Sequence, residues 1–177
     1  MTTKPELRLL AFKHKEQKQQ GCNMLTPEMK RLIAEQPLGF LATVTPDGRP
    51  SVSPKGTFTV LDDSTIAFGE IRSPGTIRNL QANPAIDVNF VDPFTRKGCR
   101  VSGATTIVTR GDDGFDGLLA RLNTALAPRI RAIVVIAMTK ALPLSSPSYD
   151  DGASEESLRK AWTARFRKLQ PGEAWQE

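Results

Sequence analysis

The segment 72–76 reads Arg-Ser-Pro-Gly-Thr, and it carries the clearest chemical signal in the sequence. Serine is a preferred N-cap, proline suits the first helical position, and glycine lets another group approach the backbone. We therefore expect a helix to begin here. Its free N–H groups and positive end would lie beside Arg72, Ser73 and Thr76. This turn could bind a phosphate or a carboxylate, and an ordinary capped helix is the alternative.

Two further polar groups could contribute to such a site. Ser53 and Lys55 are two residues apart in a predicted strand, so their side chains share one face. An ammonium group there could pair with an anion or donate to a ring carbonyl; the alternative is a solvent-facing polar face. Lys97 and Gly98 belong to segment 96–100, which has three cations in five residues. That segment could surround an anion, or it could be an ordinary charged loop.

The composition argues against several other chemistries. His14 is the only histidine, and it lies in a charged N-terminal stretch, so a Ser-His-Asp or Cys-His catalytic site is not expected. Cys22 and Cys99 cannot supply a four-ligand zinc site, and so few cysteines indicate a reducing compartment. Neither a signal-peptide core nor an apolar run of about 20 residues is present. We therefore expect a cytoplasmic protein with no metal and no membrane partner.

The positive charge is concentrated at the N-terminus. Of the net charge of +5, residues 1–20 contribute +3, from five basic and two acidic side chains. The remainder is nearly neutral, which argues against a nucleic-acid partner, although the basic segment could bind an anionic polymer. We assign residues 1–23 to an N-terminal arm and residues 24–177 to one domain with a C-terminal helix.

The hydrophobic pattern predicts six strands and about four helices. The first strands are joined by hairpin turns and no βαβ alternation is present, so we expect an antiparallel sheet or barrel with helices at its edges. The predicted helices are 26–36, 74–82, 115–126 and one that begins near Ser154, and the predicted strands are 39–45, 51–60, a third around Ile66 and Phe68, 86–90, 99–108 and 130–139.

Four short motifs add a family resemblance. Segments 38–44, 46–50 and 52–56 resemble the opening of the pyridoxamine 5′-phosphate oxidase-like family. Segment 77–84 resembles its short helix, and 100–103 resembles its following strand. The motifs are in register over about residues 25–108, and the likeness extends more loosely to 140. The resemblance implies an α+β fold, a six-stranded antiparallel split β-barrel with flanking helices.

The resemblance also implies a homodimer that holds two FMN molecules at the subunit interface. By this resemblance, Arg72, Ser73 and Thr76 would hold the flavin phosphate, and Lys55 would lie near the flavin ring with Ser53 beside it. A glutamine of the oxidase corresponds to Gly98, which Lys97 precedes. No side chain is assigned as a catalytic acid or base.

The C-terminus departs from the oxidase itself. That enzyme ends in an Arg-Leu-His-Asp-Arg-like motif, whereas residues 169–177 contain no histidine and no arginine pair. We therefore expect an FMN-dependent oxidoreductase with a different small-molecule substrate. The alternatives are a deazaflavin-dependent reductase, with the basic segment 96–100 binding an acidic cofactor tail, and a non-catalytic flavin-binding protein. Haem handling is disfavoured by the single histidine.

Overall fold

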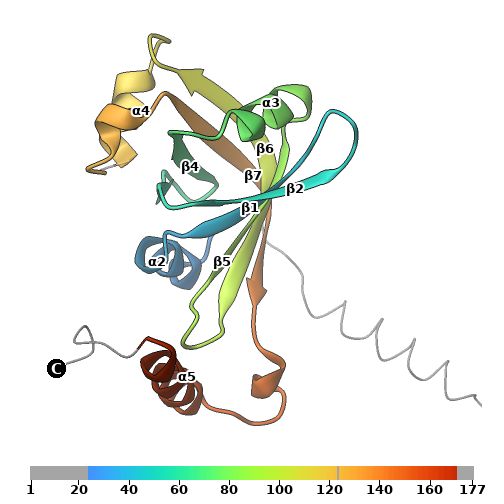
Figure 1. The fold of residues 1–177 in the computed structure, drawn as a ribbon, viewed down its shortest axis with the longest axis vertical. Helices are drawn as coiled ribbons and strands as arrows, with labels where there is room; N and C mark the ends of the chain where they lie inside the picture. The colour runs from blue at the N-terminus through green and yellow to red at the C-terminus, as the bar shows by residue number, and fades with distance from the viewer. Residues whose placement is uncertain (1–23, 123, 171–177) are drawn as a thin grey trace, which may run out of the picture.

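The fold is a curled antiparallel sheet that forms a half-barrel with helices around it (Figure 1). The computed structural model describes residues 24–122 and 124–170, so the predicted arm at 1–23 lies outside the described residues. The strand order β2-β1-β5-β6-β7-β4-β3 confirms the predicted α+β split-barrel class. In the described residues there are seven strands instead of six: β1 (Gly39–Val44), β2 (Pro50–Lys55), β3 (Phe58–Val60), β4 (Thr65–Glu70), β5 (Ala85–Val91), β6 (Gly98–Thr109) and β7 (Ala132–Leu144).

The additional strand arises because the predicted strand 51–60 is two strands. β2 pairs with β1 at one edge of the sheet, whereas β3 pairs with β4 at the other edge. The break lies at Gly56 and Thr57. The hydroxyl of Thr57 donates to the carbonyl of Gly69 at 2.8 Å and accepts the N–H of Gly69 at 3.0 Å. These bonds fix the crossing beside the end of β4.

The helices begin and end close to where the sequence predicts. Thr26 caps α2 by accepting a hydrogen bond from the N–H of Met29 at 3.3 Å, and a proline follows it at the start of the helix. The predicted helix 74–82 is observed with the same bounds, whereas the helix predicted at 115–126 ends at Leu122. The four α-helices are α2 (Pro27–Glu35), α3 (Pro74–Ala82), α4 (Phe115–Leu122) and α5 (Glu155–Leu169). None of the helices in the described part of the chain is long and apolar enough to cross a membrane.

The main core fills the inside of the half-barrel. Alternate residues of the strands point into it, among them Leu41 and Phe90, and Ile33 of α2 packs against them. Gly39 is required by this packing, since an added Cβ would lie 2.5 Å from the ring of Phe58. A second, smaller cluster joins Phe115 of α4 to the sheet.

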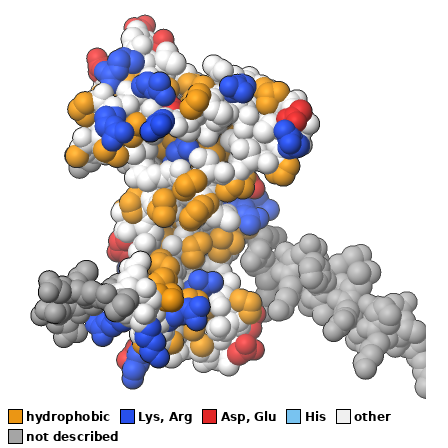
Figure 2. Space-filling view, in the orientation of Figure 1, with side chains coloured by type: hydrophobic (Ala, Val, Ile, Leu, Met, Phe, Trp, Pro, Cys, Tyr) orange, Lys and Arg blue, Asp and Glu red, His pale blue; other side chains and the backbone are white. Residues whose placement is uncertain are grey.

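The outer face of β2, β1 and β5 is unusually apolar. Val52 is 67% exposed, while its polar neighbours Ser51 and Ser53 are half-buried, so β2 directs its polar side inward. Val52 therefore does not share a buried face with Phe58, as a single continuous strand would require. Figure 2 shows hydrophobic side chains gathered across the middle of this side of the molecule. We call the exposed residues the apolar strand face: Leu38, Phe40, Val44, Val52 and Val91.

Candidate functional site

The beginning of α3 contains a buried carboxylate. Ser73 occupies the N-cap position, but its side chain does not cap the helix. Instead, its backbone N–H and its hydroxyl both donate to Oε1 of Glu70, the hydroxyl over 3.3 Å. Glu70 is the last residue of β4 and is only 4% exposed. The predicted anion site therefore contains an anion supplied by the chain itself.

Lys55 and Ser53 lie near this carboxylate. The ammonium of Lys55 donates to the hydroxyl of Ser53 at 2.5 Å. Partial burial lowers the pKa of Lys55, because a desolvated ammonium is disfavoured, and the negative charge of Glu70 acts in the opposite direction. The carboxylate thus interacts both with the lysine of β2 and with the N-cap of α3. We call Ser53, Lys55, Glu70 and Ser73 the α3 cluster.

Backbone and side-chain bonds hold the α3 cluster in place. The bonds of Thr57 to Gly69 bring the end of β2 to the end of β4. The side-chain amide of Asn79 donates to the hydroxyl of Thr43 at 2.9 Å, and this buried bond fastens α3 to β1. Buried, satisfied side-chain bonds of this kind favour one defined arrangement.

The sequence reasoning identified three of these four residues and missed Glu70. The only sequence signal for Glu70 is that it is a lone carboxylate between a run of strand-forming residues and segment 72–76. Of the other predicted phosphate ligands, Arg72 is exposed and forms no ion pair with the described residues, and Thr76 is on the buried side of α3. A cavity of about 420 Å³ opens beside α3, and Glu70, Arg78 and Arg131 are among its lining residues.

Lys97 and Gly98 lie at the other end of the molecule, at the tip of the β5–β6 hairpin (Figure 1). Lys97 donates to Glu155 of α5 at 2.7 Å, and this hydrogen bond raises the pKa of Lys97. The hydroxyl of Tyr149 donates to the carbonyl of Thr95 at 2.7 Å. Within one chain, the structure does not bring Lys97 and Gly98 to the α3 cluster.

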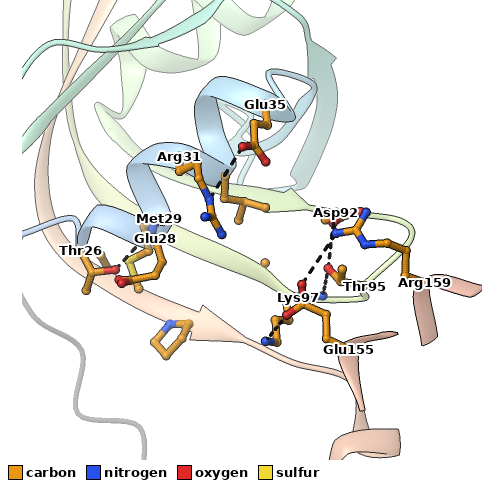
Figure 3. A pocket seen from close by; sticks show the side chains of 14 residues that line it. Thr26, Glu28, Met29, Arg31, Glu35, Asp92, Thr95, Lys97, Glu155 and Arg159 are labelled. Carbon is orange, nitrogen blue, oxygen red and sulfur yellow. Dashed lines mark hydrogen bonds and ion pairs between the residues drawn. The ribbon is translucent and has the colours of Figure 1, made fainter. Parts of the chain in front are cut away.

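A cavity of about 510 Å³ lies between α2, the hairpin tip and α5 (Figure 3). Met29, Leu32, Ala141 and Pro143 contribute apolar lining. The cations around it are all paired with carboxylates: Arg31 with Glu35 at 3.8 Å, Lys97 with Glu155 at 2.7 Å and Arg159 with Asp92 at 3.3 Å. These cations are therefore neutralised by carboxylates, and Glu28 adds a further negative charge to the lining, so the cavity offers no unpaired cation to an anionic ligand. The described residues contain no group of three or more His, Cys, Asp or Glu side chains that could hold a metal ion.

Comparison with known proteins identifies the fold and the family. HupZ of Group A Streptococcus is 29% identical, with a TM-score of 0.60 over 70% of this chain and 96% of that one. An F420 reductase is 28% identical, with a TM-score of 0.51 over 66% and 98%. An FMN-binding protein from Syntrophomonas wolfei shares the fold at 18% identity, with a TM-score of 0.59 over 80% and 97%.

A search among curated proteins finds no significant match. The family model described as pyridoxamine 5′-phosphate oxidase, however, matches residues 25–142, about two thirds of the chain. This region contains all seven strands of the half-barrel except the last two residues of β7. The chain therefore belongs to the pyridoxamine 5′-phosphate oxidase-like family.

Proposed function

We propose that this protein is a flavin-binding oxidoreductase that uses FMN and acts on a small organic substrate. The observation that carries the proposal is the half-buried pair of Lys55 and Ser53 on the wall of the half-barrel, next to the start of α3. An ammonium and a hydroxyl side by side suit the carbonyl edge of a flavin ring, which accepts hydrogen bonds. Membership of the family and the F420 reductase relative support a flavin or a deazaflavin in this place.

A bound flavin would supply the hydride-transfer chemistry, and the chain's residues would bind and orient it. Lys55 would donate to the ring edge and favour negative charge there. Ser53 would fix the direction of the ammonium through its 2.5 Å hydrogen bond. Arg72 and the exposed backbone at Gly75 are open toward solvent, and a Cβ added at Gly75 would meet nothing within 4 Å. These groups remain for the phosphate, because the donors of Ser73 are bonded to Glu70.

The proposal includes a homodimer with the flavins at its interface. The apolar strand face leaves five large apolar side chains exposed on one side of the sheet, and burying them against a second copy would be favourable. The α3 cluster and the hairpin tip with Lys97 and Gly98 are at opposite ends of one chain (Figure 1). In the proposed dimer, the α3 cluster of one copy meets the hairpin tip of the other.

Deazaflavin is the second candidate cofactor, and the F420 reductase relative favours it. The basic segment 96–100 argues against it, because its cations already have partners. Arg96 lies 4.5 Å over the ring of Trp162, Lys97 bonds to Glu155, and Arg100 donates to Asn89 at 3.0 Å. An acidic cofactor tail would have to displace these contacts, so FMN is the preferred assignment.

Titration of the purified protein with FMN and with a deazaflavin, followed by fluorescence, tests the assignment. We expect saturable quenching of FMN at one molecule per chain. No FMN binding, even after refolding with FMN present, would contradict the proposal, and tighter binding of deazaflavin would favour the second candidate. Bleaching of the bound flavin by a nicotinamide donor would then separate an enzyme from a non-catalytic flavin-binding protein.

A further inference from the structure

We propose that Glu70 is a specificity-determining residue, an internal anion that makes the start of α3 a poor phosphate site. This inference rests on the proposed flavin-binding function and deepens it. Its consequence is that the ring, through Lys55 and Ser53, provides most of the affinity for FMN. The phosphate adds little, so the protein binds riboflavin almost as well as FMN.

Glu70 occupies two of the hydrogen-bond donors at the start of α3. At the start of α3 a ligand phosphate could accept from the N–H groups of Gly75 and Thr76, which make no backbone hydrogen bond to the described residues. The N-cap, Ser73, adds two donors, its N–H and its hydroxyl. Both already donate to Oε1 of Glu70. A phosphate would have to displace this carboxylate or bind only to Arg72 and the next backbone N–H groups.

Two cations act on the carboxylate of Glu70. Its Oε2 lies 3.8 Å from Nε of Arg131, and its charge reaches Lys55. Cations from β2 and from the residue that precedes β7 therefore lie near the carboxylate. Arg131 is itself largely exposed. These cations are partly neutralised by Glu70 and attract a further anion less.

The carboxylate of Glu70 also faces the cavity beside α3. Glu70 lines this space of about 420 Å³ together with Arg78 and Arg131. Arg131 is paired with Glu70, so a phosphate entering the cavity would meet the cation of Arg78 and, on the side of Ser73, a carboxylate that is 4% exposed and poorly screened by water. Like charges placed close together at a binding interface are strongly unfavourable, and poor screening makes the repulsion larger.

The test compares dissociation constants for riboflavin and FMN in the wild type, in Glu70→Gln and in the control Asp116→Asn. Glutamine keeps an oxygen that can accept from Ser73 and removes the charge. Asp116→Asn removes an exposed charge at the start of α4. The ratio of the riboflavin constant to the FMN constant reports the contribution of the phosphate alone.

We expect a ratio near one in the wild type and in the control, and a rise of about tenfold in Glu70→Gln with riboflavin binding little changed. A wild type that prefers FMN by about a hundredfold or more would overturn the inference without any variant. An unchanged ratio of the two dissociation constants in folded Glu70→Gln would also overturn the inference.

A second measurement uses inorganic phosphate and does not depend on a flavin. At constant ionic strength, phosphate should raise the melting temperature of Glu70→Gln more than that of the wild type or of Asp116→Asn. Equal shifts in all three proteins would overturn the inference. If neither flavin binds the wild type, the proposed function fails, and the phosphate measurement still decides the role of Glu70.

Discussion

The ammonium nitrogen of Lys55 lies 2.5 Å from the hydroxyl oxygen of Ser53, two residues earlier on the same face of β2. Val52, which directly precedes Ser53, projects to the opposite side and is 67% exposed. A strand at the surface usually directs its apolar side inward, and β2 does the reverse. Each side of β2 therefore has a separate proposed role: its polar side contributes to the α3 cluster, and its apolar side to the contact with a second copy.

Replacing Lys55 with methionine should weaken the binding of FMN and of riboflavin alike, by about tenfold or more. Loss of a hydrogen bond from a charged donor costs about 1.5–3 kcal/mol. Folding should change little, because removal of the partly buried ammonium, whose pKa burial lowers, offsets the lost attraction to Glu70. Fluorescence titration measures the affinity, and thermal melting measures the stability. The matched control is Lys140→Met on the exposed part of β7; equal affinities in the two variants would refute the ring contact.

Replacing Val52 with aspartate should convert the proposed dimer into a monomer. An aspartate on the β2 side of the apolar strand face would lose its hydration in the contact between two copies, whereas in a monomer it remains in water. Light scattering after gel filtration measures the mass. Leu126→Asp, a matched change at an exposed residue next to the 3-10 turn Ala127–Arg129, should leave the dimer intact. A monomeric wild type would be evidence against the interface.

Local signals predicted the helices well, because the residues that begin and end them are close in the sequence. Proline at position 74 and the Asn83–Pro84 pair bound α3, and the predicted bounds 74–82 match those observed. The prediction of one strand over 51–60 was wrong because its outcome depends on residues that are far apart in the sequence. Alternation continues across Gly56, whereas the change of partner from β1 to β4 depends on residues distant in the sequence.

The burial of Glu70 could not be predicted from the sequence for the same reason. A single carboxylate after a strand ordinarily indicates an exposed turn. Its burial depends on Ser73, which is near in the sequence, and on Arg131, which is not. Lys97 and Gly98 were likewise predicted from motif register, and register cannot tell whether two segments meet within one chain or between two copies.

Cys99 should be unreactive in the native protein. Burial raises the pKa of its thiol from 9.0 to about 12, because the thiolate would be desolvated. In a Cys22→Ser variant, which isolates this thiol, a thiol reagent at about pH 8 should react only after urea unfolds the chain. Rapid labelling of the native protein would contradict the burial.

The same shift predicts how stability depends on pH. Below about pH 9 the Cys99 thiol is protonated in both states, and its contribution to stability is complete. As pH rises from 9.0 toward about 12, the thiol ionises in the unfolded chain only, so the free energy of unfolding falls. Cys99→Ala should show a smaller fall across this range than the wild type, as measured by urea denaturation. If the free energy of unfolding fell equally with pH in Cys99→Ala and in the wild type, a contribution from this thiol would be excluded.

Replacing Thr57 with valine should lower the free energy of unfolding and also weaken flavin binding. Valine has nearly the same shape but lacks the hydroxyl, so the N–H and carbonyl of Gly69 lose buried partners at 3.0 and 2.8 Å. Each unsatisfied buried group costs about 1–3 kcal/mol. Because Glu70 follows Gly69 directly, the α3 cluster should shift as well, and the riboflavin dissociation constant should rise.

Urea denaturation and riboflavin titration measure both effects of the Thr57 substitution. The matched control is Thr59→Val, two residues along on β3, whose hydroxyl makes no comparable bond to Gly69. Thr57→Ser should restore most of both losses, since it returns the hydroxyl. If Thr57→Val matched Thr59→Val in stability, the crossing between β2 and β3 would be fixed by packing alone. If it lost stability but kept its affinity for riboflavin, the position of the α3 cluster would be independent of Gly69.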